Sequence, residues 1–222
     1  MKGTFILGLI ACVASANATV LSFDIDGLGA GALLPQDYGD NVTATTMGNY
    51  HYGVGNGFTP DVAVSYQGSP GNQTDLNFWT SGYSDLTNVV EYEPDGAPEF
   101  SITFTASAGK EVILSGFDFG NFGGAVTLPG LTVTNQNNQV LYSVTNYSVG
   151  SFIFAHQNFD FGTGLVGESL TIRLDLTGLG GNSDNMGLDN ISFSQQVASV
   201  PEPASLAVLG LGLAFFKKRK RN

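Results

Sequence analysis

Carboxylates are the most numerous ionisable side chains in this sequence. Asp24 and Asp26 lie in the stretch Asp-Ile-Asp-Gly, and Asp184 follows the stretch Gly-Gly-Asn-Ser. Both stretches match fragments of calcium-binding loops, in which carboxylate oxygens coordinate the ion. Neither belongs to a repeat, whereas the calcium loops of Gly-rich β-helices recur at a fixed period. Each stretch alone therefore indicates only a Gly-rich turn.

No catalytic or zinc-binding motif is recognisable in the chain. His51 and His156 lack the His-x-x-x-His spacing and the cysteine neighbours of zinc sites, and His156 lies close to Phe154, which favours a structural role. Glycoside hydrolysis needs two carboxylates about 5 to 9 Å apart, a separation that spacing along the chain does not show. We predict that the protein is not an enzyme, and an extracellular glycoside hydrolase or lyase is the alternative.

Two groups of aromatic residues are candidates for sugar binding. Tyr50 and Tyr52 flank His51, and Phe78-Trp79 is followed by Tyr83. Flat rings with one polar end can stack on sugar faces, but large aromatics at strand spacing are also typical of a core. We favour the core interpretation.

Alternating apolar and polar residues recur through the body of the chain, as is typical of half-buried β-strands. The runs cover residues 100–106, 112–119, 131–134, 139–144, 152–154, 169–176 and 191–194. Turn signals such as Pro94-Asp95-Gly96 separate them. We predict an all-β fold, a β-sandwich of the jelly-roll kind, with no helix outside the two ends of the chain and with long loops in the less regular region 35–79.

The first 18 residues have the pattern of a secretory signal peptide. Lys2 precedes an apolar stretch, and the small residues Ala16 and Ala18 form a cleavage site after position 18. An alternative is a lipobox ending at Cys12, which would be lipidated. Cleavage after Ala18 removes Cys12, the single cysteine, so we expect neither disulfides nor a cysteine nucleophile in the exported protein.

The exported body is strongly acidic. Residues 19–200 contain 18 acidic and 2 basic residues, a formal charge of −16. Such a surface repels nucleic-acid phosphates and anionic lipid headgroups, so we expect no nucleic-acid partner. Divalent cations and neutral glycans are compatible with this charge.

The C-terminal segment differs from the body in composition. Residues 204–216 are apolar or small apart from Ser205, a run of about 20 Å as a helix at about 1.5 Å per residue. This is short for a bilayer core of about 30 Å. The basic residues that follow, however, act as a stop that stays inside, and they are Lys217, Lys218, Arg219, Lys220 and Arg221. We predict a transmembrane helix, with a buried core helix as the alternative.

Pro201-Glu202-Pro203, the apolar run and the basic cluster occur in this order at the end of the chain. Together with the signal peptide they resemble the PEP-CTERM sorting signal of Gram-negative bacteria. The resemblance implies processing by an exosortase near Pro201, Glu202 and Pro203, transient anchoring in the inner membrane, and transfer to the cell surface or the extracellular matrix. Pro201 and Pro203 keep the segment extended, since each lacks an N–H.

A second resemblance concerns the ectodomain. Gly187-Leu-Asp-Asn-Ile-Ser-Phe193 is similar to the closing strand of carbohydrate-binding-module jelly rolls and of many PEP-CTERM ectodomains. In such jelly rolls an acid near the first strand and one near the last often share a structural calcium ion. This implies Asp189 together with Asp24 or Asp26, and calcium would also relieve the repulsion among carboxylates. The alternative is that Asp189 only forms a turn.

We therefore predict three parts: a signal peptide over residues 1–18, a β-sandwich ectodomain over 19–199 and a sorting segment over 200–222. The predicted function is that of an exported surface or matrix protein of structural or binding character, processed by an exosortase. The alternative of a calcium-dependent module that binds extracellular polysaccharide stays open, because a fold does not define a ligand.

Overall fold

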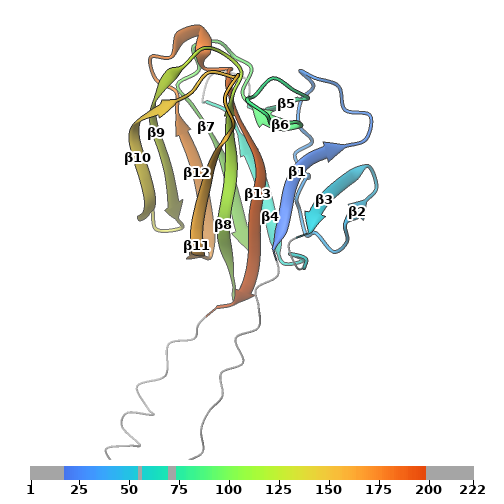
Figure 1. Ribbon diagram of the computed structural model, residues 1–222. Coiled ribbons are helices and arrows are strands. Elements are labelled where there is room, and N and C mark those ends of the chain that lie inside the picture. The colour runs from blue at the N-terminus through green and yellow to red at the C-terminus, as the bar shows by residue number, and fades with distance from the viewer. Residues whose placement is uncertain (1–17, 55–56, 70–73, 199–222) are drawn as a thin grey trace, which may run out of the picture.

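The computed structural model of this chain describes residues 18–54, 57–69 and 74–198. This part is a β-sandwich of two antiparallel sheets with one short 3-10 helix, η1 (Gly180–Asn182) (Figure 1). The all-β sandwich prediction is confirmed. Residues 1–17 of the predicted signal peptide, with Cys12 and Ala16, and the whole predicted sorting segment lie outside the described residues. Among the described residues, no helix has the length and apolar composition needed to cross a membrane.

The larger sheet has eight strands. Six of them follow the order β11-β8-β13-β1-β3-β2, while β6 pairs with β13 and β5 pairs with β6. These strands are β1 (Thr19–Ile25), β2 (Thr46–Met47), β3 (Tyr50–Val54), β5 (Asn77–Trp79), β6 (Val89–Glu91), β8 (Lys110–Asn121), β11 (Gln157–Gly167) and β13 (Met186–Val197).

The smaller sheet has five strands in the order β10-β9-β12-β7-β4. They are β4 (Val62–Gln67), β7 (Glu99–Ala106), β9 (Val126–Asn135), β10 (Val140–Val149) and β12 (Ser169–Asp175). Burial alternates along β4, β7 and β12, because every second side chain faces the other sheet. Phe104 of β7 meets Phe193 of β13 across the core, with ring centroids 4.7 Å apart.

The two ends of the described chain lie at the same end of the sandwich. Thr19 of β1 is the register partner of Phe193, and the N–H of Ala198 donates to the carbonyl of Gly109, just before β8. Strands β8 and β13 then run the length of the domain and pair at their far ends through Asn121 and Met186.

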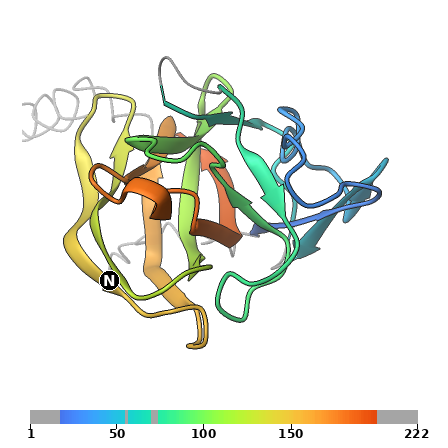
Figure 2. The same cartoon turned by 90° about the horizontal axis from the view of Figure 1, so that it is seen from above.

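Four segments meet beyond those far ends, and we call this region the distal end: residues 80–88, 122–125, 150–156 and 176–185. Backbone hydrogen bonds join them, from Ser84 to Asn121, from Phe122 to Asn185 and from Phe152 to Gly123. Figure 2 looks down on the distal end, where η1 lies. The described chain begins with β1 and ends with β13 on the opposite side (Figure 1).

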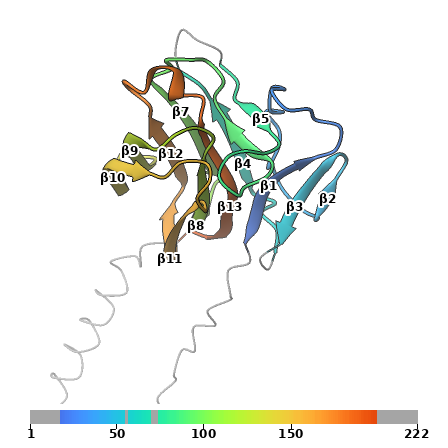
Figure 3. The same ribbon diagram turned by 45° about the horizontal axis from the view of Figure 1, so that its top comes forward.

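Two parts of the sequence prediction need correction. Residues 152–154, expected to be a strand, form an exposed turn, since three residues are too few for period-2 alternation to identify a strand. Strand β11, whose glycines Gly162 and Gly164 interrupt its apolar pattern, was not predicted. The region 35–79, where long loops were expected between early strands, contains β2, β3, β4 and β5 (Figure 3).

Candidate functional site

The structure does not bring the three predicted calcium ligands together. Asp24 and Asp26 are exposed where β1 ends, and Asp26 Oδ2 lies 3.0 Å from His51 Nε2 on the neighbouring strand β3. Asp189 is buried in β13, opposite Asp118 of β8. The described residues contain no group of three or more His, Cys, Asp or Glu side chains arranged to hold a metal ion.

The separation of these carboxylates accompanies local irregularities of the backbone in β1 and β13. The register of β1 with β3 shifts between Val20 and Asp24, and Phe23 has a φ of 50°. The register of β13 shifts just after Asp189, where Asn190 also has a φ of 50°. Burial, and then the neighbouring Asp118, raise the pKa of Asp189 to about 8, so this side chain is a neutral acid at pH 7. Such a group is a poor calcium ligand.

The same irregularities form a hollow on the larger sheet, with a volume of about 380 Å³. We call it the sheet hollow. Asp118 lies within it, where its two carboxylate oxygens accept hydrogen bonds from the amides of Asn158, at 2.8 Å, and Asn190, at 3.0 Å. Its lining combines apolar surface with polar side chains, and the two rings that line it, of Phe117 and Phe159, are almost fully buried. It therefore offers hydrogen-bonding groups without an exposed ring.

His156 links the distal end to this network. Its Nδ1 lies 2.9 Å from Asp85 Oδ1, and its Nε2 lies 3.5 Å from Asp118 Oδ1. The backbone N–H of His156 also donates to Asp85, and these bonds lower the pKa of that carboxylate. The contacts agree with the structural role expected for His156.

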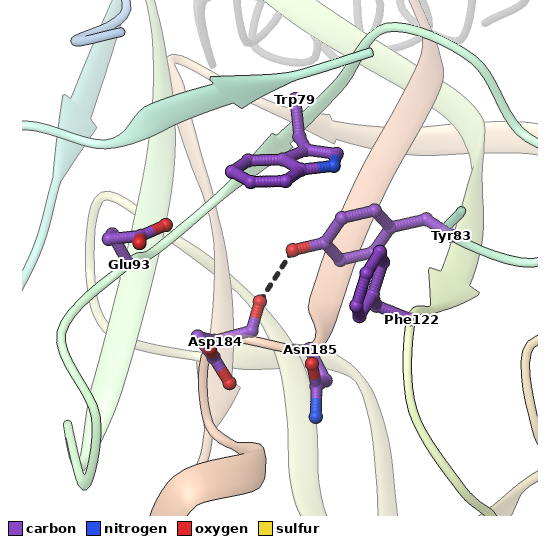
Figure 4. A pocket seen from close by; sticks show the side chains of 6 residues that line it. All are labelled: Trp79, Tyr83, Glu93, Phe122, Asp184 and Asn185. Atoms are coloured by element: carbon purple, nitrogen blue, oxygen red, sulfur yellow. Dashed lines mark hydrogen bonds between the residues drawn. The ribbon is translucent and has the colours of Figure 1, made fainter. Parts of the chain in front are cut away.

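A second cavity lies at the distal end, and we call it the aromatic pocket (Figure 4). Its volume is about 70 Å³, and its lining residues are Trp79, Tyr83, Glu93, Phe122, Asp184 and Asn185. Three aromatic residues and three polar residues thus line one small cavity.

Different elements hold the three rings in place. Trp79 ends β5, Phe122 follows β8, and Tyr83 comes from the loop between β5 and β6. The Phe122 ring lies 6.2 Å from that of Trp79 and 5.6 Å from that of Tyr83, centroid to centroid. The hydroxyl of Tyr83 donates to the backbone carbonyl of Asp184 at 2.6 Å. Tyr83 is buried, Trp79 is half-buried and Phe122 is 44% exposed, so the last two present ring surface to solvent.

Gly187 of β13 lets the Tyr83 ring lie flat against the sheet. A Cβ at this position would come within 2.7 Å of Tyr83 Cδ1 and 2.9 Å of Val89 Cγ2. We expect Gly187→Ala to lower the free energy of unfolding by about 1–3 kcal/mol, the usual effect of overpacking. Urea denaturation measures this, with Gly124→Ala as the control, since a Cβ there meets nothing within 4 Å. Equal stability of the two variants would contradict the packing argument.

The acidic side of the pocket continues into the interior. Glu93 is exposed at the rim, whereas Glu91 lies beneath with both carboxyl oxygens buried and without a hydrogen-bond partner among the described residues. Burial, followed by the charges of Glu93 and Asp184, raises the pKa of Glu91 to about 9. Burial, followed by Asp95, also raises the pKa of Asp184. Glu91 is therefore neutral at pH 7 and inaccessible to any solute.

The charge around the aromatic pocket excludes one class of ligand. The body of the chain has two basic residues, Lys110 and Arg173. Lys110 begins β8 at the other end of the sandwich and lies 3.4 Å from Asp61, and Arg173 pairs with Glu99. An anionic ligand would thus meet Glu93 and Asp184 without a compensating cation.

The sequence prediction located this site in part. Of its aromatic candidates, Phe78 and Tyr52 are core residues, whereas Trp79 and the buried Tyr83 line the pocket. Phe122, Glu93 and Asn185 were missed. Phe122 precedes Gly123-Gly124, but nothing local shows that its ring is exposed.

The C-terminal segment matches a known sorting signal. A family model described as the PEP-CTERM protein-sorting motif matches residues 199–221. The chain carries a PEP-CTERM motif. This motif implies export and processing by an exosortase, and it covers the predicted residues Pro201, Glu202 and Pro203 and the basic cluster Lys217, Lys218, Arg219, Lys220 and Arg221.

The ectodomain that precedes the PEP-CTERM motif has solved structural neighbours. One is TmCBM61 in complex with β-1,4-galactotriose, with 15% identity, a TM-score of 0.32, and coverage of 61% of this chain and 88% of that chain. A family 35 carbohydrate-binding module from an environmental isolate has 17% identity, a TM-score of 0.28, and coverage of 62% and 91%. The arabinose-bound MgGH51 α-L-arabinofuranosidase has 15% identity, a TM-score of 0.34, and coverage of 79% and 28%.

Similarity of this size carries no information about the ligand of the PEP-CTERM ectodomain. No curated protein matches the chain. The case for a function therefore depends on the sorting motif and on the geometry of the pocket.

Proposed function

We propose that this chain is an exported surface protein that binds a neutral glycan at the aromatic pocket. The observation that carries the proposal is the combination of the partly exposed rings of Trp79 and Phe122 with the polar groups of Glu93, Asp184 and Asn185 around one opening. Rings stack on the apolar C–H faces of sugars, while carboxylates and amides bond to hydroxyl groups. The acidic surroundings favour an uncharged ligand.

The position of the pocket supports this role. The PEP-CTERM motif begins at residue 199, directly after β13 ends at Val197. Strand β13 has 12 residues, which span roughly 40 Å at about 3.4 Å per residue, and the pocket lies beyond its other end. A precursor held at the membrane by its C-terminal segment would thus present the pocket away from the bilayer.

Two further points of the proposal concern the order of the strands in the larger sheet and the binding of calcium. β1 and β13, the first and last strands, are neighbours in the larger sheet, as the proposed jelly roll requires. The calcium dependence of glycan binding is a separate question, because the described residues contain no group of three or more His, Cys, Asp or Glu side chains that could hold the ion. Glycan arrays run with and without calcium show whether glycan binding depends on calcium.

We propose binding rather than catalysis at this site. A general acid must reach the substrate, and the neutral acid Glu91 is fully buried. The alternative of a glycoside hydrolase would use the pocket-lining acids Glu93 and Asp184. Release of reducing ends from any glycan that the protein binds would favour that alternative.

Trp79→Ala tests the binding proposal. We expect a neutral polysaccharide or oligosaccharide selected on a glycan array to lose about tenfold or more in affinity, because losing one stacked ring removes about 1.4 kcal/mol or more. Isothermal titration calorimetry of the exported protein measures the change.

Phe58→Ala is the matched control. Phe58 is 40% exposed, similar to Phe122, but it adjoins Thr59, whose side chain bonds to Thr19 at the other end of the sandwich. Phe122→Ala should resemble Trp79→Ala, and Phe58→Ala should bind like the unchanged protein. Wild-type binding by Trp79→Ala and Phe122→Ala would refute the assignment of the pocket.

A further inference from the structure

A short loop next to the aromatic pocket exposes three large apolar side chains in succession. Phe152 is 51% exposed, Ile153 71% and Phe154 60%. Exposed apolar residues are usually scattered singly, and contiguous ones mark interaction surfaces. We call these three residues the apolar loop.

Hydrogen bonds hold the apolar loop on both sides. The amide of Asn121 donates to the carbonyl of Gly150 at 2.8 Å, and the N–H of Phe152 donates to the carbonyl of Gly123 at 3.0 Å. The N–H of His156 donates to Asp85 at 2.8 Å. The chain before, within and after the exposed residues is therefore tied to the sandwich. A backbone held in this way loses little conformational entropy when a ligand binds.

The apolar loop is continuous with the aromatic pocket. Its bond to Gly123 joins it to the residue after Phe122, and the Phe122 ring is itself 44% exposed. The pocket holds only about 70 Å³, whereas sites that enclose a small-molecule ligand hold about 300 to 1,000 Å³. A ligand that enters the pocket therefore leaves most of its atoms outside, next to this surface.

The charges around the apolar loop are consistent with an uncharged partner. His156, two residues after the loop, pairs with Asp85 at 2.9 Å. The two basic residues of the body pair with acids elsewhere in the fold. A polymer that lies across the loop thus meets apolar surface and paired charges.

We propose that Phe152, Ile153 and Phe154 form a second contact surface that binds further units of an extended, uncharged polysaccharide whose first unit occupies the aromatic pocket. The proposal depends on the glycan binding proposed above and specifies its substrate class: a linear polymer rather than a monosaccharide. The pocket selects one unit, and the apolar loop adds affinity with chain length.

The test uses size-graded oligosaccharides of two to eight units, prepared from the neutral polysaccharide that the exported protein binds best on an array. We expect the affinity of the unchanged protein to rise about tenfold or more from the shortest to the longest oligosaccharide. The Phe152→Ala/Phe154→Ala double variant should bind the shortest one unchanged and lose this rise. Phe58→Ala should keep it, and Trp79→Ala should weaken binding at every length.

The outcomes separate the two proposals. Binding with a length dependence that the double variant keeps would overturn the role of the apolar loop and leave the pocket assignment intact, whereas absence of binding to any glycan would overturn both. Equal loss at all lengths would also overturn the loop proposal. Sedimentation velocity, and flotation with phosphatidylcholine vesicles, test the other occupants: a dimer or vesicle binding lost in the double variant would assign the surface to a second copy of this chain or to lipid.

Discussion

Replacing Glu202 with Ala is expected to leave the chain uncut and retained in the inner membrane of a bacterium that has an exosortase. Glu202 lies at the centre of Pro201-Glu202-Pro203, within the segment that matches the PEP-CTERM motif. Each proline lacks an N–H, and Glu202 is the charged residue between them. Membrane fractionation followed by immunoblotting detects the uncut precursor as a larger species. We expect nearly all of the protein in this form.

Two variants complete this experiment. Pro203→Ala should accumulate precursor as well, whereas Ser205→Ala, two residues further into the apolar run, should be processed normally. The ectodomain should be unaffected, since the motif follows the last strand, β13. Normal release of both the Glu202→Ala and Pro203→Ala proteins would refute the sorting assignment.

The stability of the ectodomain is expected to fall as the pH rises from about 5 to about 8. Glu91 and Asp189 have folded-state pKa values raised to about 9 and about 8, mainly by burial. In the unfolded chain both groups ionise near pH 4. Between these limits the folded state binds more protons than the unfolded state, so each pH unit lowers stability, by roughly 1.4 kcal/mol for each fully shifted group. Asp85 and Asp175, whose pKa values are lowered mainly by hydrogen bonds, contribute the opposite slope.

Glu91→Gln isolates one of these contributions. The amide has nearly the shape of the neutral acid but cannot ionise, so the variant should melt at a higher temperature than the unchanged protein at pH 8 and at a similar temperature at pH 5. Thermal melts followed by circular dichroism across this range measure the slope. Asp189→Asn should act in the same direction.

Glu168→Gln is the control for this series, because Glu168 is exposed and its replacement should leave the slope unchanged. A slope that is the same in the unchanged protein, Glu91→Gln and Asp189→Asn would show that neither acid is neutral in the folded state. The sign of the effect matters for the site, since ionised Glu91 would place a charge beneath Tyr83, whose hydroxyl binds the carbonyl of Asp184.

Several features of this protein follow from local sequence. Strands β7 and β12 show strict alternation, because one face of each lies on the core, and that pattern is visible in any window of six residues. The sorting motif is a linear signal, so its order of Pro-Glu-Pro, apolar run and basic cluster is sufficient to identify it. The acidic charge of the body is a property of composition.

Other features depend on contacts between distant segments. Residues 152–154 have the apolar composition of a strand, yet Asn121 and Gly123, about 30 residues earlier, hold them in an exposed loop. Asp189 and Asp24 lie near neighbouring strands, as expected, but backbone irregularities at Phe23 and Asn190 accompany the burial of one carboxylate and the exposure of the other. Local patterns carry no information on where such register shifts fall.

The aromatic pocket likewise depends partly on local sequence and partly on contacts between distant segments. The sequence marked Trp79 and Tyr83 as rings of interest, but not whether they belong to the core or to a surface. That depends on three segments separated by 40 to 60 residues, which meet where β5, β8 and β13 end or begin. The sequence alone determined the class of fold and the sorting signal, because both are visible in local patterns. Side-chain exposure results from all neighbours in space, so only the tertiary structure decided which rings and acids face solvent together.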